Sequence, residues 1–493
     1  MKKLVWFATA LALAACGDDA GTDTPDAGTD APVNPDASPG FTPPMAHSFQ
    51  LSSAGPDVIM SATPGPNGGF YAAGWVAADT DPATPKHVVV VKLLASGMPD
   101  STFGTNGVAN TQVPFVGGID EIDVATQSSG KIIVSATVAA ATSNPEDAAD
   151  RDIALIRLTT AGELDETFGD NGVVTHSFST SRAVTSGNPA RDGVRGLAVG
   201  PQDAIFVHGY QLAEGTVMGG TDPRTDTDFV IAKFDASGEL VTSYGDGGTR
   251  TLDIYNNADG VHSGATARGI HAFADGSVIA GGYANAGLTM GPQAVLIKLT
   301  PDGDFDPAFD DDGWFHDTVL GVQTEVYNVA VHGDHIVTAG YGRDTGSIND
   351  WISLRFKANT GVRDKTWGGD GEVLFDPTPD DNMAGSNCRN AIALPDGKTM
   401  LLGSSSRMTN NGGANPEVQD AVFAILDENG ELDTGYGTGI VTYALGDDGV
   451  DAFWGGAVNG GNALIVGFRG AKAGNAQTAT DNDDAYAVLL PLR

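Results

Sequence analysis

Cysteine and basic residues are both scarce in this sequence of 493 residues. It has two cysteines, too few for a fold held together by disulfides. Lys and Arg total 26 against 63 Asp and Glu, which gives a formal net charge of −37 at pH 7. Because nucleic-acid binding requires clustered positive charge, we exclude nucleic acid as a partner. Hydrophobic residues make up 41% of the chain, which is enough for a packed core.

Long apolar runs are missing too, apart from a short one near the N-terminus. Residues 4–15 are apolar but too few to span a bilayer stably, so a secretory signal fits them better than a transmembrane helix. The run follows Lys2 and Lys3 and ends in the sequence LAAC, which closes on Cys16 and resembles the lipobox of bacterial lipoproteins. An ordinary signal peptide that happens to contain cysteine is the alternative.

The lipobox resemblance implies a membrane anchor. In that family the chain is cut before the cysteine, which here makes residues 1–15 a lipoprotein signal peptide, and Cys16 carries several acyl chains. Gly17 follows Cys16, in place of the Asp that marks inner-membrane retention in well-studied lipoproteins. We therefore expect an exported, lipid-anchored protein at the outer membrane, facing the periplasm or the cell surface.

A tether is expected between the anchor and the folded domain. Residues 17–45 contain six Pro and six Asp and no Lys or Arg, a composition that cannot bury apolar surface. We interpret residues 16–45 as the lipidated cysteine followed by a disordered, self-repelling tether, and residues 46–493 as the folded part.

One phrase recurs throughout the folded part. It reads KLLASGMPDSTFGTNGV at 92–108 and RLTTAGELDETFGDNGV at 157–173, and four further copies follow. The aromatic residues near the ends of the copies, 58 to 76 residues apart, are Phe103, Phe168, Tyr244, Phe309, Trp367 and Tyr436. Such spacing indicates one structural unit used many times. The phrases resemble delta-60 repeats, a bacterial family of β-propeller-like structures. The resemblance covers residues 46–493 and implies a fold rather than an activity.

Each unit also reads as four short strands separated by turn residues, the pattern of an all-β protein. In the third unit the expected strands are 195–199, 205–210, 229–234 and 249–254. Four-stranded antiparallel units repeated around an axis form a propeller.

The strand count predicts how the ring ends. Third-strand runs occur seven times and fourth-strand runs follow six of them, while the chain ends on a third strand at 486–490. A strand-like run at 46–51 precedes all the others. The predicted fold is therefore all-β: a seven-bladed β-propeller with four-stranded antiparallel blades. The N-terminal strand closes the ring by completing the last blade, which removes an exposed edge.

Motifs for catalysis are missing. The sequence has no His-Glu-x-x-His zinc pair and no Gly-x-Ser-x-Gly nucleophile elbow. Cys388 begins an inner strand, where we expect a buried, inert thiol rather than a nucleophile. The connections between second and third strands, at 77–87, 211–228 and 404–420, vary most, and functional residues are expected on such variable loops.

Closely spaced carboxylates are candidates for calcium. The three clusters are Asp302, Asp304 and Asp306 with the neighbouring Asp310, Asp311 and Asp312; Asp222, Asp226 and Asp228; and Asp481, Asp483 and Asp484. A hard cation relieves the repulsion between such groups with oxygen ligands. None of the clusters has EF-hand spacing, so the alternative is solvated turn residues and no cofactor.

Three arginines, Arg195, Arg268 and Arg389, occupy equivalent places at the start of the first strand of their units. One interpretation pairs Arg195 with Asp228 and Arg389 with Asp420 within a blade, because an Arg side chain crosses the gap left by an intervening glycine. The other places the arginines, Arg268 above all, at the axis of the ring, where their planar donors bind an anionic group.

The sequence favours a binding function over catalysis. We expect a monomeric, lipid-anchored scaffold that binds an unidentified protein or glycan through its divergent loops. One alternative is a propeller enzyme, a lyase or hydrolase of extracellular polysaccharide, which requires convergent acid and base groups near the channel mouth. The other is a purely structural surface spacer.

Overall fold

The computed structural model describes residues 29–30, 41–52, 55–79, 84–118, 121–141, 150–179, 192–216, 221, 224, 226–254, 264–285, 291–345, 349–377, 385–408, 414–446, 449–471 and 484–493. The expected signal peptide, Cys16 and most of the expected tether lie outside these residues. Within the described residues, no helix has the length and apolar character needed to cross a bilayer.

Five sheets have four antiparallel strands each, and in each sheet the spatial order of the strands follows the chain. The first sheet contains β3 (Asp57–Pro64), β4 (Phe70–Ala77), β5 (Lys86–Leu93) and β6 (Val108–Phe115). The second contains β7 (Ile122–Thr126), β8 (Ile132–Ala139), β9 (Arg151–Leu158) and β10 (Val173–His176). The third contains β11 (Gly193–Val199), β12 (Ile205–Leu212), β13 (Thr227–Phe234) and β14 (Thr249–Leu252). The fourth contains β15 (Ala265–Ala272), β16 (Val278–Asn285), β17 (Pro292–Leu299) and β18 (Trp314–Asp317). The fifth contains β19 (Gln323–His332), β20 (His335–Arg343), β21 (Asp350–Lys357) and β22 (Glu372–Phe375).

The remaining strands form one nine-stranded sheet. Its first four-stranded part contains β23 (Asn387–Ala393), β24 (Thr399–Met408), β25 (Ala414–Leu426) and β26 (Ile440–Tyr443). Its second part contains β27 (Val450–Asn459), β28 (Asn462–Ala471), β29 (Asp484–Pro491) and the N-terminal β2 (Ala46–Phe49), which pairs antiparallel with β29. A single parallel bridge between Gln419 and Val450 joins the two parts, and β1 (Thr29–Asp30) pairs with the outer side of β2.

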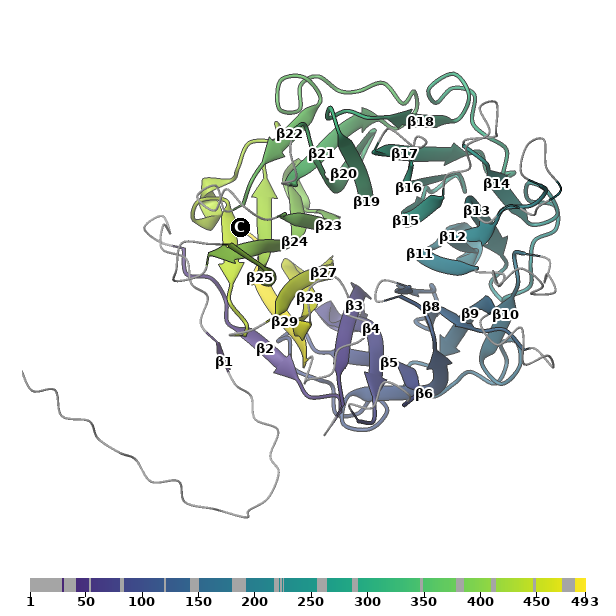
Figure 1. The fold of residues 1–493 in the computed structure, drawn as a ribbon. Coiled ribbons are helices and arrows are strands. Elements are labelled where there is room, and N and C mark those ends of the chain that lie inside the picture. The colour runs from purple at the N-terminus through teal and green to yellow at the C-terminus, as the bar shows by residue number, and fades with distance from the viewer. Residues whose placement is uncertain are drawn as a thin grey trace, which may run out of the picture.

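The sheets are arranged around a common centre, with the first strand of each sheet innermost (Figure 1). Each first strand contacts the first strand of the next sheet, from β3 through β7, β11, β15, β19 and β23 to β27, and β27 contacts β3. Within the described ranges, four 3-10 helices occupy turns: η1 (Pro66–Gly68), η3 (Pro201–Asp203), η4 (Pro395–Gly397) and η5 (Thr434–Tyr436).

The middle strands of each sheet are buried on both faces. β4 is buried along its whole length, and β5 contains the continuous apolar run Val88–Val91. A short unbroken apolar run of this kind is typical of a strand covered on both sides. The outer strand β6 instead alternates between buried and exposed residues, as expected where one face meets solvent.

The repeated phrase forms the loop between the third and fourth strands, and its aromatic residue is buried in all six copies. The residue after the aromatic ring donates its N–H to a turn carbonyl of the next sheet: Gly104 to Ala161 at 2.8 Å and Gly368 to Asn429 at 2.9 Å. Gly104 and Gly368 have φ of +51° and +62°, a conformation that favours glycine. The phrase therefore specifies a contact between neighbouring sheets.

The strand expectations for the third unit agree with β11 to β14 to within two residues at each end. The expected run 46–51 is strand β2 but ends at Phe49. One expectation differs: the last two four-stranded units were expected as separate sheets, yet the long β25 reaches Val450 and joins them.

Candidate functional site

A β-bulge recurs in the first strand of six of the sheet units. The strand register shifts at the same relative place in β3, β11, β15, β19, β23 and β27. The residues at these shifts are Met60, Arg195, Arg268, Tyr327, Arg389 and Trp454. A bulge inserts an extra residue and re-aims its side chain. We call these six residues the bulge ring.

The bulge ring surrounds one small cavity. All six residues line it, together with Ser61, Ile122, Asp123, Gly269, Asn328 and Asn390, and its volume is about 50 Å³. The structure therefore brings the three predicted arginines together from three different sheets. A space of this size holds a carboxylate-sized group or one or two water molecules.

Aromatic rings hold two of these arginines in place. The Arg268 guanidinium lies 4.0 Å from the centre of the Tyr327 ring and donates to the Tyr283 hydroxyl at 3.2 Å. The Arg389 guanidinium lies 4.5 Å from the Tyr327 ring centre and 4.7 Å from that of Trp454. Stacking of this kind fixes a planar guanidinium while its N–H groups keep their in-plane directions.

A buried carboxyl group lies behind the stacked arginines. Gln323 donates to the Glu325 carboxylate at 2.5 Å, and the hydroxyls of Tyr327 and Tyr341 are 3.0 Å apart. Burial raises the pKa of Glu325, although the nearby charge of Arg268 opposes the shift. Burial also raises the pKa of Tyr341. Tyr341 therefore keeps its hydroxyl proton near the bulge ring.

Arg195 has a different environment from the one expected. It donates to Glu121 of the neighbouring sheet at 3.1 Å, and the hydroxyl of Tyr210 donates to the same oxygen at 2.8 Å. Asp228, its expected partner, pairs instead with Arg224 at 3.2 Å. The bulge explains this correction, because it turns Arg195 out of its own sheet and toward the adjacent one.

A second layer of polar residues links the sheets around the cavity. Asp123 accepts hydrogen bonds from the Ser61 hydroxyl at 2.5 Å and from the Leu197 N–H at 2.8 Å. Asn390 donates to the Trp454 carbonyl at 2.9 Å. Burial raises the pKa of Asp123 to about 6, although the hydrogen bonds from Ser61, Leu197 and Val124 oppose the shift. These bonds position the bulge ring.

Two of the candidate calcium ligands in the first acidic cluster, Asp304 and Asp306, contact protein groups. Asp304 pairs with Arg250 at 2.6 Å, and Asp306 accepts from the Ala308 N–H at 3.0 Å. The N–H of Gly245 donates to the main-chain carbonyl of Asp302 at 2.8 Å.

The second and third acidic clusters are only partly described. Asp226 and Asp228 both contact the Arg224 guanidinium, and burial raises the pKa of Asp228 to about 7. Asp484 pairs with Arg469 at 2.6 Å. Asp222, Asp481 and Asp483 lie outside the described residues. Across the described ranges, no three His, Cys, Asp or Glu side chains are grouped to hold a metal ion.

Cys388 lies in β23 and is fully buried. Burial raises the pKa of its thiol to about 12, so the reactive thiolate is not formed at neutral pH. The expected burial of this residue is confirmed.

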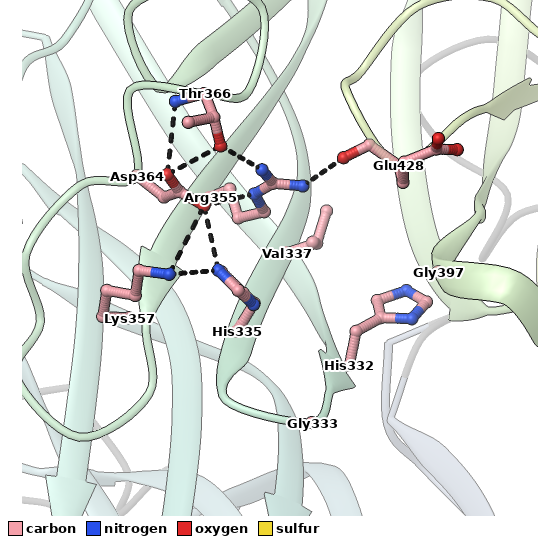
Figure 2. Close-up of a pocket in the computed structure, with 10 residues that line it drawn as sticks. All are labelled: His332, Gly333, His335, Val337, Arg355, Lys357, Asp364, Thr366, Gly397 and Glu428. Atoms are coloured by element: carbon pink, nitrogen blue, oxygen red, sulfur yellow. Dashed lines mark hydrogen bonds and ion pairs between the residues drawn. The ribbon is translucent and has the colours of Figure 1, made fainter.

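A second cavity, absent from the sequence predictions, lies near the turns that connect first and second strands. Its volume is about 590 Å³ (Figure 2). The basic and imidazole side chains that line it are His332, His335, Arg355 and Lys357. His332 and His335 bracket the tight turn between β19 and β20. In the sequence, the one indication of this cavity is Lys357, because the equivalent position in the other repeats holds no basic residue.

Two segments of the chain, residues 127–168 and 274–309, match the family described as "Domain of unknown function (DUF5122) beta-propeller". These matches support a β-propeller repeat family. Each segment ends on the buried aromatic residue of the repeated phrase, Phe168 or Phe309. Among proteins with curated descriptions, none matches this sequence.

Solved structures with a similar fold have low sequence identity to this chain. A protein of unknown function from Dyadobacter fermentans is 12% identical, with 92% of this chain and 100% of that chain covered and a TM-score of 0.43. The β-propeller domain of the Trilobed protease from Pyrococcus furiosus is 11% identical, with 88% and 95% covered and a TM-score of 0.40. Aldose sugar dehydrogenase from Streptomyces coelicolor, in its PQQ-bound form, is 14% identical, with 76% and 95% covered and a TM-score of 0.35.

Proposed function

We propose that this protein is a binding scaffold that recognises an anionic group at the bulge ring. The observation that carries the proposal is the convergence of Arg195, Arg268 and Arg389 on one cavity, in a chain of formal net charge −37. Guanidinium groups bind carboxylates and phosphates through paired hydrogen bonds. Two of the three are already held against aromatic rings, so little side-chain entropy is lost on binding.

The small cavity favours a charged end group of a larger ligand. At about 50 Å³ it accommodates a carboxylate but not a sugar ring. We propose that the remainder of the ligand, a glycan or a protein, lies over the divergent loops between second and third strands. Nucleic acid is not part of the proposal, because the overall charge repels it.

The proposal includes a closed, seven-bladed propeller of delta-60-like repeats. Five four-stranded sheets and the two parts of the nine-stranded sheet supply the blades. The pairing of β2 with β29 and the contact of β27 with β3 support closure by the N-terminal strand. A monomer is proposed, since this closure leaves fewer free sheet edges.

We further propose that Cys16 anchors the protein as an exported lipoprotein at the outer membrane, facing the periplasm or the cell surface. Support comes from the lipobox-like sequence and the Pro- and Asp-rich segment after it. The protein that carries Cys16→Ser should leave the membrane fraction and lose acyl labelling. Retention of this variant in membranes after a salt wash contradicts the anchor.

Catalysis is not part of the proposal. A polysaccharide lyase or hydrolase requires an acid and a base that both reach the substrate. The carboxyl groups of Asp123 and Glu325 near the ring are hydrogen-bonded to protein groups, and Glu325 is buried. A purely structural spacer remains the other alternative, and it predicts no ligand at all. No cofactor is proposed, and calcium at the acidic loops is treated as a separate, testable alternative.

Glycan arrays and titrations test the proposed site. Purified full-length protein should bind glycans that carry carboxylate or phosphate groups and not their neutral counterparts. Replacing Arg268 by Ala should abolish this binding, whereas replacing Arg250 by Ala, whose ion pairs with Asp246 and Asp304 lie outside the cavity, should leave it unchanged. Equal binding of neutral and acidic glycans, or unchanged binding by the Arg268→Ala variant, refutes the proposal. Turnover of a bound glycan supports the enzyme alternative instead.

A further inference from the structure

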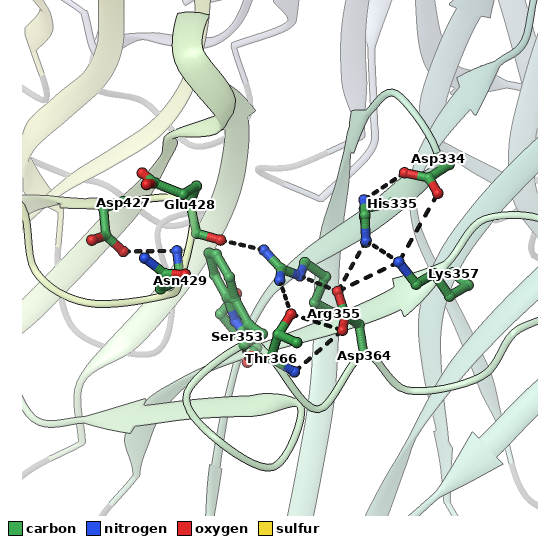
Figure 3. Close-up of polar contacts among 11 residues, drawn as sticks. Asp334, His335, Ser353, Arg355, Lys357, Asp364, Thr366, Asp427, Glu428 and Asn429 are labelled. Carbon is green, nitrogen blue, oxygen red and sulfur yellow. Dashed lines mark hydrogen bonds and ion pairs between the residues drawn. The ribbon is translucent and has the colours of Figure 1, made fainter.

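The second cavity contains a group of contacts that belongs to the repeat scaffold. Arg355 donates to Asp364 at 2.9 Å, to Thr366 at 2.6 Å and to the main-chain oxygen of Glu428 in the next unit at 2.6 Å (Figure 3). The second sheet has the same arrangement, in which Arg157 contacts Asp165, Thr167 and the main-chain oxygen of Ala236. These contacts are structural in both sheets.

Lys357 departs from the repeat. It follows Arg355 by two residues at the end of β21. The corresponding residues of the other units are Leu94, Thr159, Asp235, Thr300, Asp427 and Pro491. None of them is basic, so the positive charge at Lys357 is an addition to the scaffold rather than a part of it.

The two histidines also reflect a local change in the scaffold. In the second sheet, the longer turn after β7 places Gln127 and Ser128 against Asp203 of the next sheet, with the Ser128 N–H 2.6 Å from the Asp203 carboxylate. In the fifth sheet, the turn between His332 and His335 contains only two residues. His332 contacts Thr399 of the next unit at 3.1 Å, and the shortened turn leaves the cavity open.

The Asp364 carboxylate at this cavity already has protein partners. Asp364 accepts hydrogen bonds from Arg355 and Thr366 and lies 2.9 Å from Nε2 of His335. Although burial opposes the shift, the Thr366 hydrogen bonds and the charge of Arg355 lower the pKa of Asp364. The carboxylate of Glu428 points away from Arg355, which contacts the main-chain oxygen of that residue (Figure 2).

Lys357 is consequently positioned to accept another anion. Its Nζ lies 2.5 Å from Nε2 of His335 but 3.9 Å from Asp364 and 4.0 Å from Asp334. The Lys357 side chain is 39% exposed, and that of Asp334 is 73% exposed, so solvent screens their attraction. An anion in the cavity gains contacts with an ammonium group that has no short carboxylate contact among the described residues.

We propose that this cavity binds a phosphate group, through Lys357 with His332. A lysine ammonium group binds phosphate as a point charge, and the His332 imidazole, whose Nε2 contacts Thr399, offers Nδ1 as a directional donor. Lys357 and His335 lie side by side, with both ring nitrogens of His335 in contact with protein groups, and His332 lies apart from them across the cavity (Figure 2). This site is separate from the bulge ring, and it does not depend on the function proposed there.

Calorimetric titration of the full-length protein with inorganic phosphate tests this site. The Lys357→Thr variant installs the residue found at this position in the second and fourth sheets, so it should fold normally. We expect it to weaken phosphate binding at least about tenfold. Lys398→Gln is the matched control, because Lys398 pairs with Asp433 at 2.7 Å in the next unit and lies outside the cavity. The control should bind phosphate as the unmodified protein does.

Four results overturn the proposal. The first is no heat of binding by the unmodified protein at up to about 10 mM phosphate. The second is unchanged binding by the Lys357→Thr variant. The third is equal weakening by Lys357→Thr and Lys398→Gln, which points to general electrostatics. A phosphate titration of Arg268→Ala separates the two sites: loss of binding there assigns the phosphate to the bulge ring and also overturns this proposal.

Discussion

Replacing Asp57 by Ala should destabilise the junction where the two ends of the chain meet. Asp57 lies in β3 and is 1% exposed. Its carboxylate accepts the N–H groups of Leu51 at 2.9 Å and Ser52 at 3.0 Å, which follow β2, and that of Ala485 at 2.8 Å in β29. One side chain therefore connects the first sheet to both the N-terminal and the C-terminal strand.

The expected loss follows from these three contacts. A buried N–H left without an acceptor costs about 1–3 kcal/mol, and the partly buried N–H groups of Leu51 and Ser52 cost less than the buried one of Ala485, so Asp57→Ala should lower the free energy of unfolding by about 3–6 kcal/mol. Urea unfolding measures the change as a lower midpoint with a similar slope. Asp334→Ala, at an exposed carboxylate, is the control and should change the midpoint little. A loss below about 1 kcal/mol in Asp57→Ala refutes the reasoning.

The same residue predicts a pH dependence. Burial raises the pKa of Asp57 to about 7, whereas the unfolded chain has the ordinary value near 4. The folded state then holds this proton while the unfolded state has released it. The corresponding stability is present below about pH 4 and is lost as the pH rises through about 7, with an upper limit of about 4 kcal/mol for a three-unit shift.

Asp57→Asn removes the titrating group and should reduce the slope of stability against pH between 4 and 7. Asp451 is a comparable buried carboxyl group, and burial raises its pKa to about 7 as well, so some slope should remain in the variant. A pH profile identical to that of the unmodified protein contradicts the assignment to Asp57.

Three further predictions concern the scaffold and its loops. Deleting residues 46–51 should lower the melting temperature and expose β29 to hydrogen exchange, because β2 pairs with that strand; an unchanged melting curve argues against the closure. Gly368→Ala should lower the free energy of unfolding by about 1–3 kcal/mol, measured by thermal unfolding. The φ of Gly368 is +62°, and a Cβ atom there would lie 1.9 Å from the Glu372 carbonyl oxygen. Gly369→Ala is the control, because no atom lies near its Cβ position and only the backbone strain should remain. Adding Ca²⁺ should give neither heat nor a melting shift, because Asp304 and Asp226 already pair with Arg250 and Arg224; a clear thermal shift supports calcium sites instead.

At the candidate site, the sequence predicted the equivalent positions of the arginines but not the partner of Arg195. Counting from the repeated phrase placed Arg195, Arg268 and Arg389 at equivalent positions, and the structure gathers them around one cavity. The expected pair of Arg195 with Asp228 followed from regular strands, in which side chains alternate between faces. The bulge shifts that alternation, and nothing in the local sequence of β11 marks it.

At the cavity near Lys357, the sequence shows the unusual residue but not the arrangement of the turn beside it. The unusual residue was visible in the sequence, because the aligned positions in the other units hold no basic residue. The proximity of His332 and His335 was not visible, because it depends on a two-residue turn whose length becomes meaningful only beside the longer turn of another sheet. Only beside the longer turn of the second sheet is the turn of the fifth sheet recognisably short.

The sequence by itself determined the strand order of the third unit, the recurrence of one phrase with its aromatic residue and the pairing partner expected for residues 46–51. These features follow from local periodicity and from the repetition of one phrase, which makes each copy evidence for the others. Only the tertiary structure decided which sheets share ion pairs, which residues surround the central cavity and where two sheets join. Those contacts depend on bulges and loop lengths, because one inserted residue redirects a side chain toward another sheet without changing the hydrophobic pattern.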